Sequence, residues 1–457
     1  MRKLLFATTA LTTAALIAGV PGDAAAQTAP TTPTSPYRER PPAMAPTPTP
    51  APATEPAPKP KAERIKLGLS GYYQQWAVIT DQSLKSRVGP TGAPSLTGTR
   101  KMQPTNTVDN KHNAEICVIG QTTLDNGLTI GVNVQIEAFS EGDNIDESYL
   151  FVQSPTMGQV VVGDENNAGY LLHVTAPDGG VSLDSGDLCN IRAFEVGGSG
   201  VSPSGGGVFF DSPLCTTNLR LLDDDSGKFT YITPRFAGFQ AGISYIPQFE
   251  SGGDNNTALK RAGFTDANST DSGATRGITN GFAGGLNYTD TFGKVGVQAS
   301  GGILWAETGS SASGSSPTTA GFFTSNDDLI AFNGGAQFSY AGFSFGGGFL
   351  RVPQGPRPTT VTGGVVTNEK LNGTSWTVGG AYEFGPYKVG LDWLTGTNNK
   401  TSGGGVDRLD QGVVSGTYTL GPGIRLVGGL FYYDWQEENR NSQNNGVGAL
   451  TGLKLGF

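Results

Sequence analysis

Apolar and polar residues alternate along strand-length runs throughout residues 64–457. After residues 125–128, one side of such a run carries only aliphatic side chains, those of Leu128, Ile130, Val132, Val134 and Ile136. The other side carries Thr129, Gly131, Asn133, Gln135 and Glu137. Because successive side chains of a β-strand point to opposite faces, each strand presents one apolar and one polar face. The pattern predicts an all-β chain.

Seven short turns separate these runs, and aromatic residues flank several of them, as in "FAGF" (236–239) and "FGPY" (384–387). Their glycines are Gly127, Gly158, Gly238, Gly293, Gly342, Gly385 and Gly421. Glycine permits the positive φ of a tight hairpin. Two strands for each of the seven hairpins, plus one at each terminus, predict 16 antiparallel strands. The number is even, as in bacterial transmembrane β-barrels.

Composition separates a membrane barrel from a soluble sandwich. The chain has 69 Gly, 37 Phe and Tyr, and only 15% charged residues, and these charges fall on the polar strand faces. A soluble sandwich carries its charges outside and its apolar face inside, whereas a transmembrane barrel faces lipid outside and water inside. The net charge of −9 argues against nucleic acid as a partner.

The five tryptophans are expected near the outer ends of strands. Alternation points Trp305, Trp376 and Trp393 toward lipid, and Trp76 and Trp435 toward the lumen. The last strand ends at Phe457 and is expected to pair with the first, at residues 64–78, because a closed barrel has no open edge.

The first 63 residues differ from the rest. Residues 1–26 have the positive start, apolar centre and small-residue end of a signal peptide. Residues 27–63 are rich in proline and predict a disordered periplasmic spacer. The barrel domain is therefore expected to span residues 64–457.

The chain resembles the general porins of Gram-negative outer membranes, in particular the alphaproteobacterial type. The resemblance rests on the Phe-terminated last strand, the run "DNGLTIGVNVQIEA" (125–138) with its continuation to residue 170, and the aromatic-glycine turns. It implies a homotrimer in the outer membrane and a water-filled channel for small hydrophilic solutes. It also implies that Phe457 is an insertion signal read by the outer-membrane assembly machinery. The spacer departs from the family pattern.

The longest gap between turn glycines, 80 residues from Gly158 to Gly238, predicts a long third outer loop from about Asp164 to Ser226. In porins this loop folds into the lumen, and here it is acidic. The candidate constriction residues of the loop are Asp164, Glu165, Asp178, Asp184 and Asp187. Acidic groups at a narrow point favour cations, so the pore is expected to be weakly cation-selective.

Alternation also points charged residues of the wall into the lumen. The acidic candidates are Glu115, Glu137 and Asp392. Lys66, Arg425 and Lys454 form a basic group on three neighbouring strands near the periplasmic mouth.

Three cysteines would lie in an oxidising compartment. Cys189 and Cys215 both belong to the third loop and are the favoured disulfide pair. Cys117 is lumen-facing by phase and could instead join the loop to the wall.

Three classes of function fit this pattern: a passive diffusion channel, a substrate-specific channel, and a barrel enzyme or adhesin. The first is favoured. A lumen-facing aromatic track would favour the second. The chain has two His, His112 and His173, and no "GxSxG", "HExxH" or "CxxC" motif, so no catalytic site or metal centre is predicted. No cofactor is expected, although "DNIDE" (143–147) or "DDDSG" (223–227) could offer oxygen ligands to Ca²⁺.

Overall fold

The structure is a computed structural model. It describes residues 64–83, 85–86, 100–101, 107–137, 145–184, 188, 214–220, 223, 226–249, 278–308, 322–323, 328–355, 358–362, 365–368, 372–399, 406–436 and 442–457. The predicted signal peptide and spacer lie outside the described residues.

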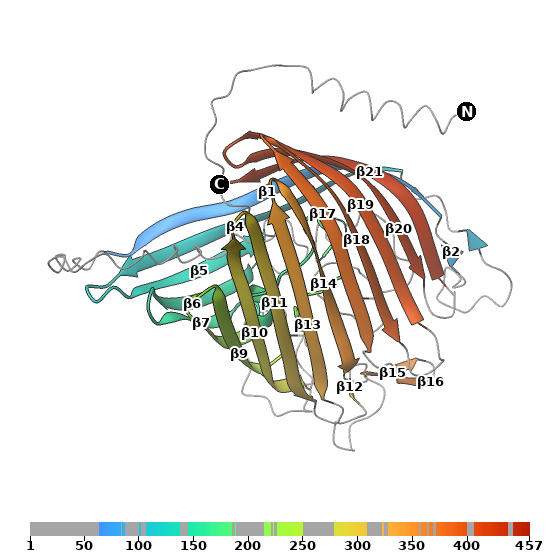
Figure 1. Ribbon diagram of the computed structural model, residues 1–457. Coiled ribbons are helices and arrows are strands. Elements are labelled where there is room, and N and C mark those ends of the chain that lie inside the picture. Colours follow the sequence, from blue (N-terminus) through green and yellow to red (C-terminus); the bar gives the residue numbers. More distant parts are fainter. Residues whose placement is uncertain are drawn as a thin grey trace. The chain divides into compact units, whose positions relative to one another are not determined.

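Sixteen strands of the described chain pair antiparallel in a closed ring (Figure 1). In order they are β1 (Lys66–Gln82), β4 (Val108–Thr123), β5 (Thr129–Glu137), β6 (Ile145–Ser154), β7 (Gly158–Asp164), β8 (Gly227–Ile232), β9 (Phe239–Gln248), β10 (Ile278–Phe292), β11 (Val295–Thr308), β13 (Leu329–Tyr340), β14 (Phe343–Gln354), β17 (Gly373–Phe384), β18 (Tyr387–Asn399), β19 (Val406–Gly421), β20 (Ile424–Gln436) and β21 (Ser442–Gly456). This confirms the predicted 16-stranded barrel.

The ring closes between the first and last strands. β1 pairs with β21 from Tyr72 opposite Gly456 to Gln82 opposite Gly446. At the chain end, the Gly71 N–H donates to the Phe457 carbonyl at 2.9 Å, and the Phe457 N–H donates to the Gly71 carbonyl at 3.0 Å. The barrel therefore has no open edge at this seam.

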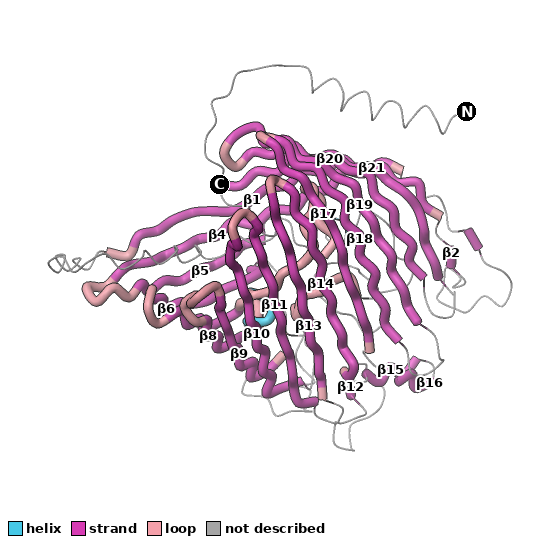
Figure 2. The backbone as a smooth tube through the Cα atoms, in the orientation of Figure 1, coloured by secondary structure: helices cyan, strands magenta, loops and turns pink. Residues whose placement is uncertain are grey.

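Short elements occupy the connections. β2 (Lys85–Ser86) and β3 (Arg100–Lys101) extend the edge of β21, while β12 (Phe322–Phe323), β15 (Pro358–Thr362) and β16 (Val365–Asn368) form a separate sheet. The helix α2 (Ala168–Leu171) follows β7 and is the cyan segment in Figure 2. The Asn167 side chain caps it by accepting from the Tyr170 N–H. No helix among the described residues is long and apolar enough to cross a membrane.

All seven predicted hairpin turns are present between consecutive barrel strands. Six of the predicted glycines have positive φ, for example 84° at Gly342 and 82° at Gly127. The seventh prediction was wrong by two residues, because Gly421 ends β19 and Gly423 takes the positive φ of 71°. Pro422 stands between them, so the turn begins after the strand rather than within it.

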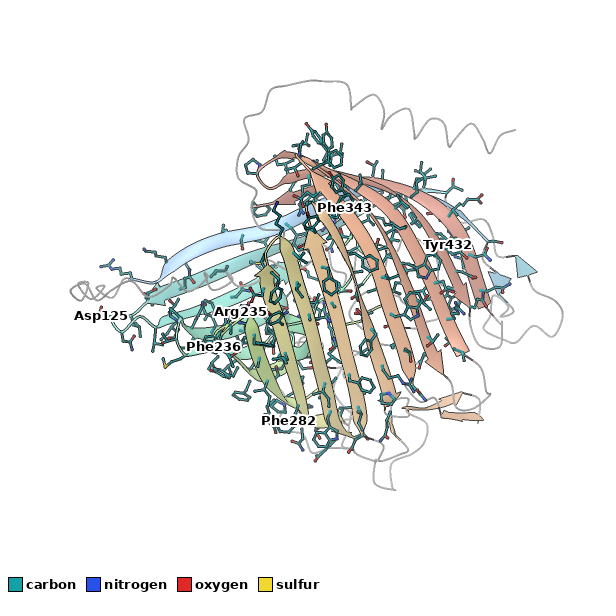
Figure 3. All side chains as sticks on the ribbon, viewed as in Figure 1. Asp125, Arg235, Phe236, Phe282, Phe343 and Tyr432 are labelled. Atoms are coloured by element: carbon teal, nitrogen blue, oxygen red, sulfur yellow. The ribbon has the colours of Figure 1, made fainter. Side chains whose placement is uncertain are left out.

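The outer face of the wall is apolar and exposed. The side chains of Phe282, Phe343 and Tyr432 stand out from it (Figure 3). The phase of the tryptophans is as predicted. Trp376 is 44% exposed, whereas Trp76 and Trp435, on the opposite face, are 0% and 2% exposed.

Aromatic rings line the outer face near the turns of β14 to β19. Phe343 stacks on Tyr382 with ring centroids 4.2 Å apart, and the series continues through Phe384 and Tyr387 to Tyr418 with centroid separations of 5.0–5.4 Å. Amphipathic rings at one level of a barrel wall are typical of the boundary between hydrocarbon and water.

Candidate functional site

The described residues between β7 and β8 lie along the polar face of the wall. Side chains from strands β9 to β19 hydrogen-bond its backbone, and the residues that do so are Ser244, Asn287, Ser300, Asn333, Ser375, Ser415 and Thr417. Ser300 accepts from the Val174 N–H at 2.8 Å, for example, and Thr417 donates to the Gly179 carbonyl at 2.8 Å. We call the described residues of this segment, 165–184, 188, 214–220, 223 and 226, the pore loop.

Wall glycines allow the pore loop to approach closely. A Cβ on Gly335 of β13 would lie 1.8 Å from the Val174 carbonyl oxygen, and a Cβ on Gly396 of β18 would lie 1.6 Å from that of Leu214. At these positions no other residue fits without displacing backbone. Part of the chain's high glycine content therefore serves the contact between wall and loop rather than the turns.

Two apolar clusters complete the contact between loop and wall. Leu214 and Leu219 pack with side chains of β10, β11, β13 and β14. Val181, Leu183 and Leu188 pack with the polar-face side chains of β1 and β18 to β21, which are Trp76, Val78, Leu394, Leu409, Val413, Val427, Phe431, Tyr433, Trp435 and Leu450. Four aromatic residues of the polar face, Trp76, Phe431, Tyr433 and Trp435, are thus covered by the described part of this loop.

Asp184 joins the outgoing and returning halves of the pore loop. One oxygen of Asp184 accepts from the Thr217 N–H at 2.6 Å and from the Thr216 hydroxyl at 2.9 Å, and the other accepts from the Thr217 hydroxyl. Burial raises the pKa of this carboxyl, but hydrogen bonds from His173, Thr175 and Thr217 outweigh burial and hold the pKa at about 2. Asp184 is therefore ionised at any physiological pH.

The return of the pore loop to β8 is held by a buried ion pair. Lys228 Nζ lies 3.6 Å from Asp223 Oδ2 and donates to the Ser226 carbonyl at 2.7 Å. Asn167 Nδ2 donates to the same carboxylate at 2.9 Å and to the Leu219 carbonyl at 2.8 Å. The two ends of the loop are thereby fastened to each other.

Three carboxylates meet on the wall at β4 to β6. The ligand oxygens of Glu115, Glu137 and Asp146 all lie within 4.8 Å of one another. Glu115 stands opposite Glu137 in the register and accepts from the Tyr72 hydroxyl at 2.6 Å. A register shift between Gln135 and Ile136 makes room for Asp146. We call these three residues the acid triplet.

Comparison with known proteins identifies the family. The sequence profile described as "Gram-negative porin" matches residues 9–437 of this chain. The chain belongs to the Gram-negative porins. It is therefore an outer-membrane channel for passive diffusion.

Individual relatives of this porin are distant. It is 25% identical over 360 residues to an uncharacterized protein of Rickettsia bellii. The aligned region covers 68% of this chain and 76% of the relative. Similar solved structures include Salmonella typhi OmpF in complex with daunomycin, with 13% identity, 86% and 98% of the two chains covered and a TM-score of 0.49. The anion-selective porin from Comamonas acidovorans has 12% identity, coverage of 86% and 100%, and a TM-score of 0.46.

The predicted acidic loop residues of the porin lie in different surroundings. Asp164 shares the strand phase of the exposed Val160, and its Oδ1 lies 3.4 Å from where a Cβ of Gly227 would stand on the outer face. Glu165 is 2% exposed and accepts from the Asn166 N–H. Half-buried Asp178 accepts from the Gly180 N–H at 2.7 Å.

These placements change the expectation for the loop acids. Asp164 keeps the outward phase of Val160 and therefore does not border the lumen. Asp184 is enclosed between the loop halves, and Asp187 lies outside the described residues. Among the wall acids, Asp392 is 3% exposed on the polar face of β18.

The predicted basic group is only partly assembled. Arg425 and Lys454 stand directly opposite each other on β20 and β21, and Lys454 Nζ lies 5.1 Å from the centre of the Trp76 ring. Lys454 is opposite Gln74 on β1, eight residues from Lys66, which corresponds to about 27 Å along a strand. Lys66 therefore does not join the other two.

Cys215 is disulfide-bonded, and its sulfur accepts from Gln411 Nε2 at 3.2 Å. The favoured partner Cys189 lies outside the described residues, so the pairing remains a prediction. Cys117 is a thiol on β4, in register with Ser70 and Gln135.

Sequence reasoning missed the groups that hold the loop. Lys228, Asn333 and the small polar residues of the wall carry no local motif. The available signal was weak: a small polar residue on the lumen face of six barrel strands, β9, β10, β11, β13, β17 and β19.

Proposed function

We propose that this porin prefers cations over anions and that the acid triplet sets the preference. The observation that carries the proposal is the convergence of three carboxylates within 4.8 Å on the wall, with Glu137 and Asp146 half-buried rather than enclosed. The contacts of the pore loop with the polar face support a lumen that the loop narrows.

Local charge decides the selectivity of a pore more than net charge does. Exposed charges beyond about 10 Å are largely screened at 0.1 M salt, so the overall charge of −9 acts weakly on an ion in the lumen. Low-dielectric walls focus the field of carboxylates beside the path and raise the local cation concentration. Arg425 and Lys454 lie on other strands, at the turn end of the wall.

Removing one carboxylate from the triplet should weaken cation preference. A unit charge about 8 Å from a hydrated ion contributes about 0.5 kcal/mol in water, a factor of about two in local concentration. Glu137→Gln should therefore lower the cation-to-anion permeability ratio about twofold, measured as reversal potential across a planar bilayer at low salt.

Glu307→Gln is the matched control, because Glu307 is exposed at the outer end of β11 and its loss changes net charge equally. An equal shift in both variants would contradict the proposal.

Recordings with calcium or with EGTA test the further proposal that Ca²⁺ binds the triplet through Asp146. Binding would reduce selectivity only when calcium is present.

We also propose a homotrimer whose assembly depends on Phe457. The Phe457 side chain is 60% exposed at the closing seam, beside the hydrogen bonds to Gly71. An apolar side chain of this size favours an apolar environment by about 1.5–3 kcal/mol. Phe457→Asp should leave export intact and lower the assembled trimer about tenfold, measured by heat-modifiable migration of outer-membrane fractions. Phe457→Tyr keeps the ring and should assemble normally; equal trimer levels in the two variants would refute the role.

A further inference from the structure

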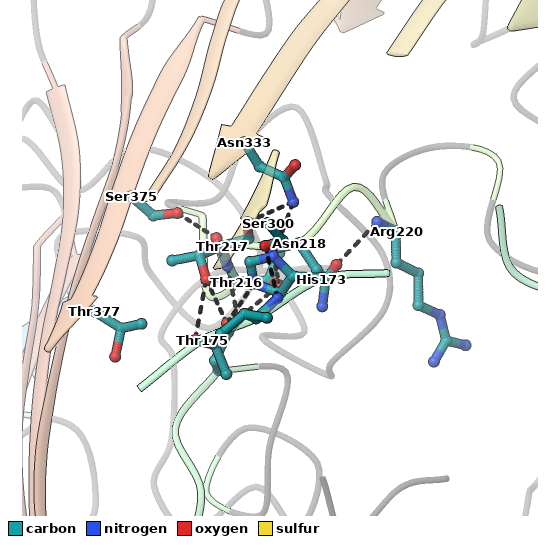
Figure 4. Close-up of polar contacts among 12 residues, drawn as sticks. His173, Thr175, Thr216, Thr217, Asn218, Arg220, Ser300, Asn333, Ser375 and Thr377 are labelled. Atoms are coloured by element: carbon teal, nitrogen blue, oxygen red, sulfur yellow. Dashed lines mark hydrogen bonds and ion pairs between the residues drawn. The ribbon is translucent and has the colours of Figure 1, made fainter. Parts of the chain in front are cut away.

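His173 lies where both halves of the pore loop meet the wall. Its side chain is 7% exposed. Nε2 lies 3.1 Å from the Thr217 hydroxyl and 3.4 Å from Asp184 Oδ2, and Nδ1 lies 3.1 Å from Asn333 Nδ2 on β13 (Figure 4). One imidazole thus connects the outgoing half, the returning half and a barrel strand.

The hydrogen bonds of Asn333 fix the tautomer of this imidazole. Asn333 Nδ2 also lies 3.2 Å from the Thr217 carbonyl oxygen, which can only accept. The amide nitrogen must therefore face the loop, since the amide oxygen there would oppose the carbonyl. Because Asn333 donates, His173 Nδ1 must accept, and the ring proton is on Nε2, directed at Thr217 and Asp184.

We propose that His173 is the positioning residue that fixes the pore loop against β13 and that it does so only as the neutral imidazole. Its effect on conduction rests on the proposed function, in which the pore loop narrows the lumen. The effect on the loop itself does not depend on conduction.

Protonation of His173 adds a hydrogen to Nδ1, so that two hydrogen-bond donors, Nδ1–H and the Asn333 amide nitrogen, face each other. The Nδ1–H of an imidazolium meets Asn333 Nδ2, and turning the amide to accept that proton sets its oxygen against the Thr217 carbonyl. Either way the loop loses a hydrogen bond to β13. The bonds from Nε2 to Asp184 and Thr217 are kept, so the loop halves stay joined while they lose one of their hydrogen bonds to β13.

The side chains around His173 include one carboxylate and no second imidazole among the described residues. Among the described residues facing His173, the charged one is Asp184, with its pKa at about 2. The wall contributes Ser300, Asn333 and Ser375, which do not titrate (Figure 4). Arg220 lies on the returning half, but its guanidinium points away from His173 (Figure 4). Imidazole is the side chain that ordinarily changes charge between pH 5 and 8.

The test is hydrogen–deuterium exchange of peptides within 165–184 and 214–220, measured on the assembled protein at pH 5 and pH 7.5 and corrected for intrinsic rates. Loss of one hydrogen bond corresponds to about a five- to tenfold change in the opening equilibrium. The loop should exchange faster by that factor at pH 5. Open-channel current noise in bilayers should rise over the same pH range.

Variants make the result specific. The chain has two histidines, so His112→Gln, at an exposed position on β4, is the matched control and should keep the pH dependence. His173→Gln should abolish it. Asn333→Leu should exchange rapidly at both pH values.

Persistence of the dependence in His173→Gln, or its loss in His112→Gln, would overturn the inference. So would equal exchange of the wild type at both pH values. That last outcome leaves cation selectivity untouched, because selectivity is measured separately by the reversal potential of Glu137→Gln.

Discussion

Gly335→Val is expected to detach the pore loop from the wall. The added Cβ would stand 1.8 Å from the Val174 carbonyl oxygen, and β13 cannot retreat because it is paired on both sides. Overpacking of this kind costs about 1–3 kcal/mol even where side chains can adjust, and here the obstacle is backbone. We expect at least a tenfold loss of the docked state, measured as faster hydrogen exchange of residues 165–184 and as altered conductance.

Gly301→Val on neighbouring β11 is the control, because Gly301 lies on the opposite, exposed face of the wall. The atom nearest to its added Cβ is 3.9 Å away. It should assemble and exchange like the wild type. If both variants behaved alike, the close approach at Gly335 would have no energetic consequence.

Asp184→Asn should release the two halves of the pore loop from each other. Both carboxylate oxygens of Asp184 now accept hydrogen bonds, from Thr216, Thr217 and His173. An asparagine keeps one accepting oxygen, but its NH₂ group faces hydrogen-bond donors. Leaving buried donors unpaired costs about 1–3 kcal/mol. Exchange in residues 214–220 should accelerate by up to about a hundredfold.

Asp178→Asn is the matched control, since Asp178 accepts a single hydrogen bond from a backbone N–H, which an asparagine oxygen can accept equally well.

Strong acid should accelerate exchange of residues 214–220 in the wild type, as Asp184→Asn does at neutral pH. The pKa of Asp184 is lowered from 3.8 to about 2, so its contribution is complete above about pH 4 and is lost as pH falls through about 2. A loop that stays protected at pH 1.5 would contradict this role.

Period-2 alternation and turn chemistry were sufficient to predict the barrel, because both are local properties. The strand count, the loop bounds from Asp164 to Ser226 and the phases of Trp76 and Trp435 follow from counting residues between turns. The error at Gly421 arose where two glycines flank a proline and either could begin the turn.

The candidate site was harder to predict, since its contacts join residues far apart in the chain. Asp178 and Asp184 look alike in sequence, yet one caps a local turn and the other binds residues more than 30 positions away. Asp146 joins Glu115 only through a register shift that no turn residue announces. Asp164 was chosen because it leaves the strand where the loop begins, but it keeps the outward phase of Val160 and therefore does not point to the lumen.

The glycines under the pore loop make the wall a template for one particular loop. The absence of a side chain at Gly335 and Gly396 leaves space for the Val174 and Leu214 carbonyls. Each glycine lies more than 150 residues from its carbonyl in sequence. A loop grafted from another porin would therefore contact a wall whose glycines do not match the positions of its carbonyls. Loop and wall can be exchanged between relatives only together, so the interchangeable unit of this porin is the loop with the inner faces of the strands that it contacts, not the loop alone.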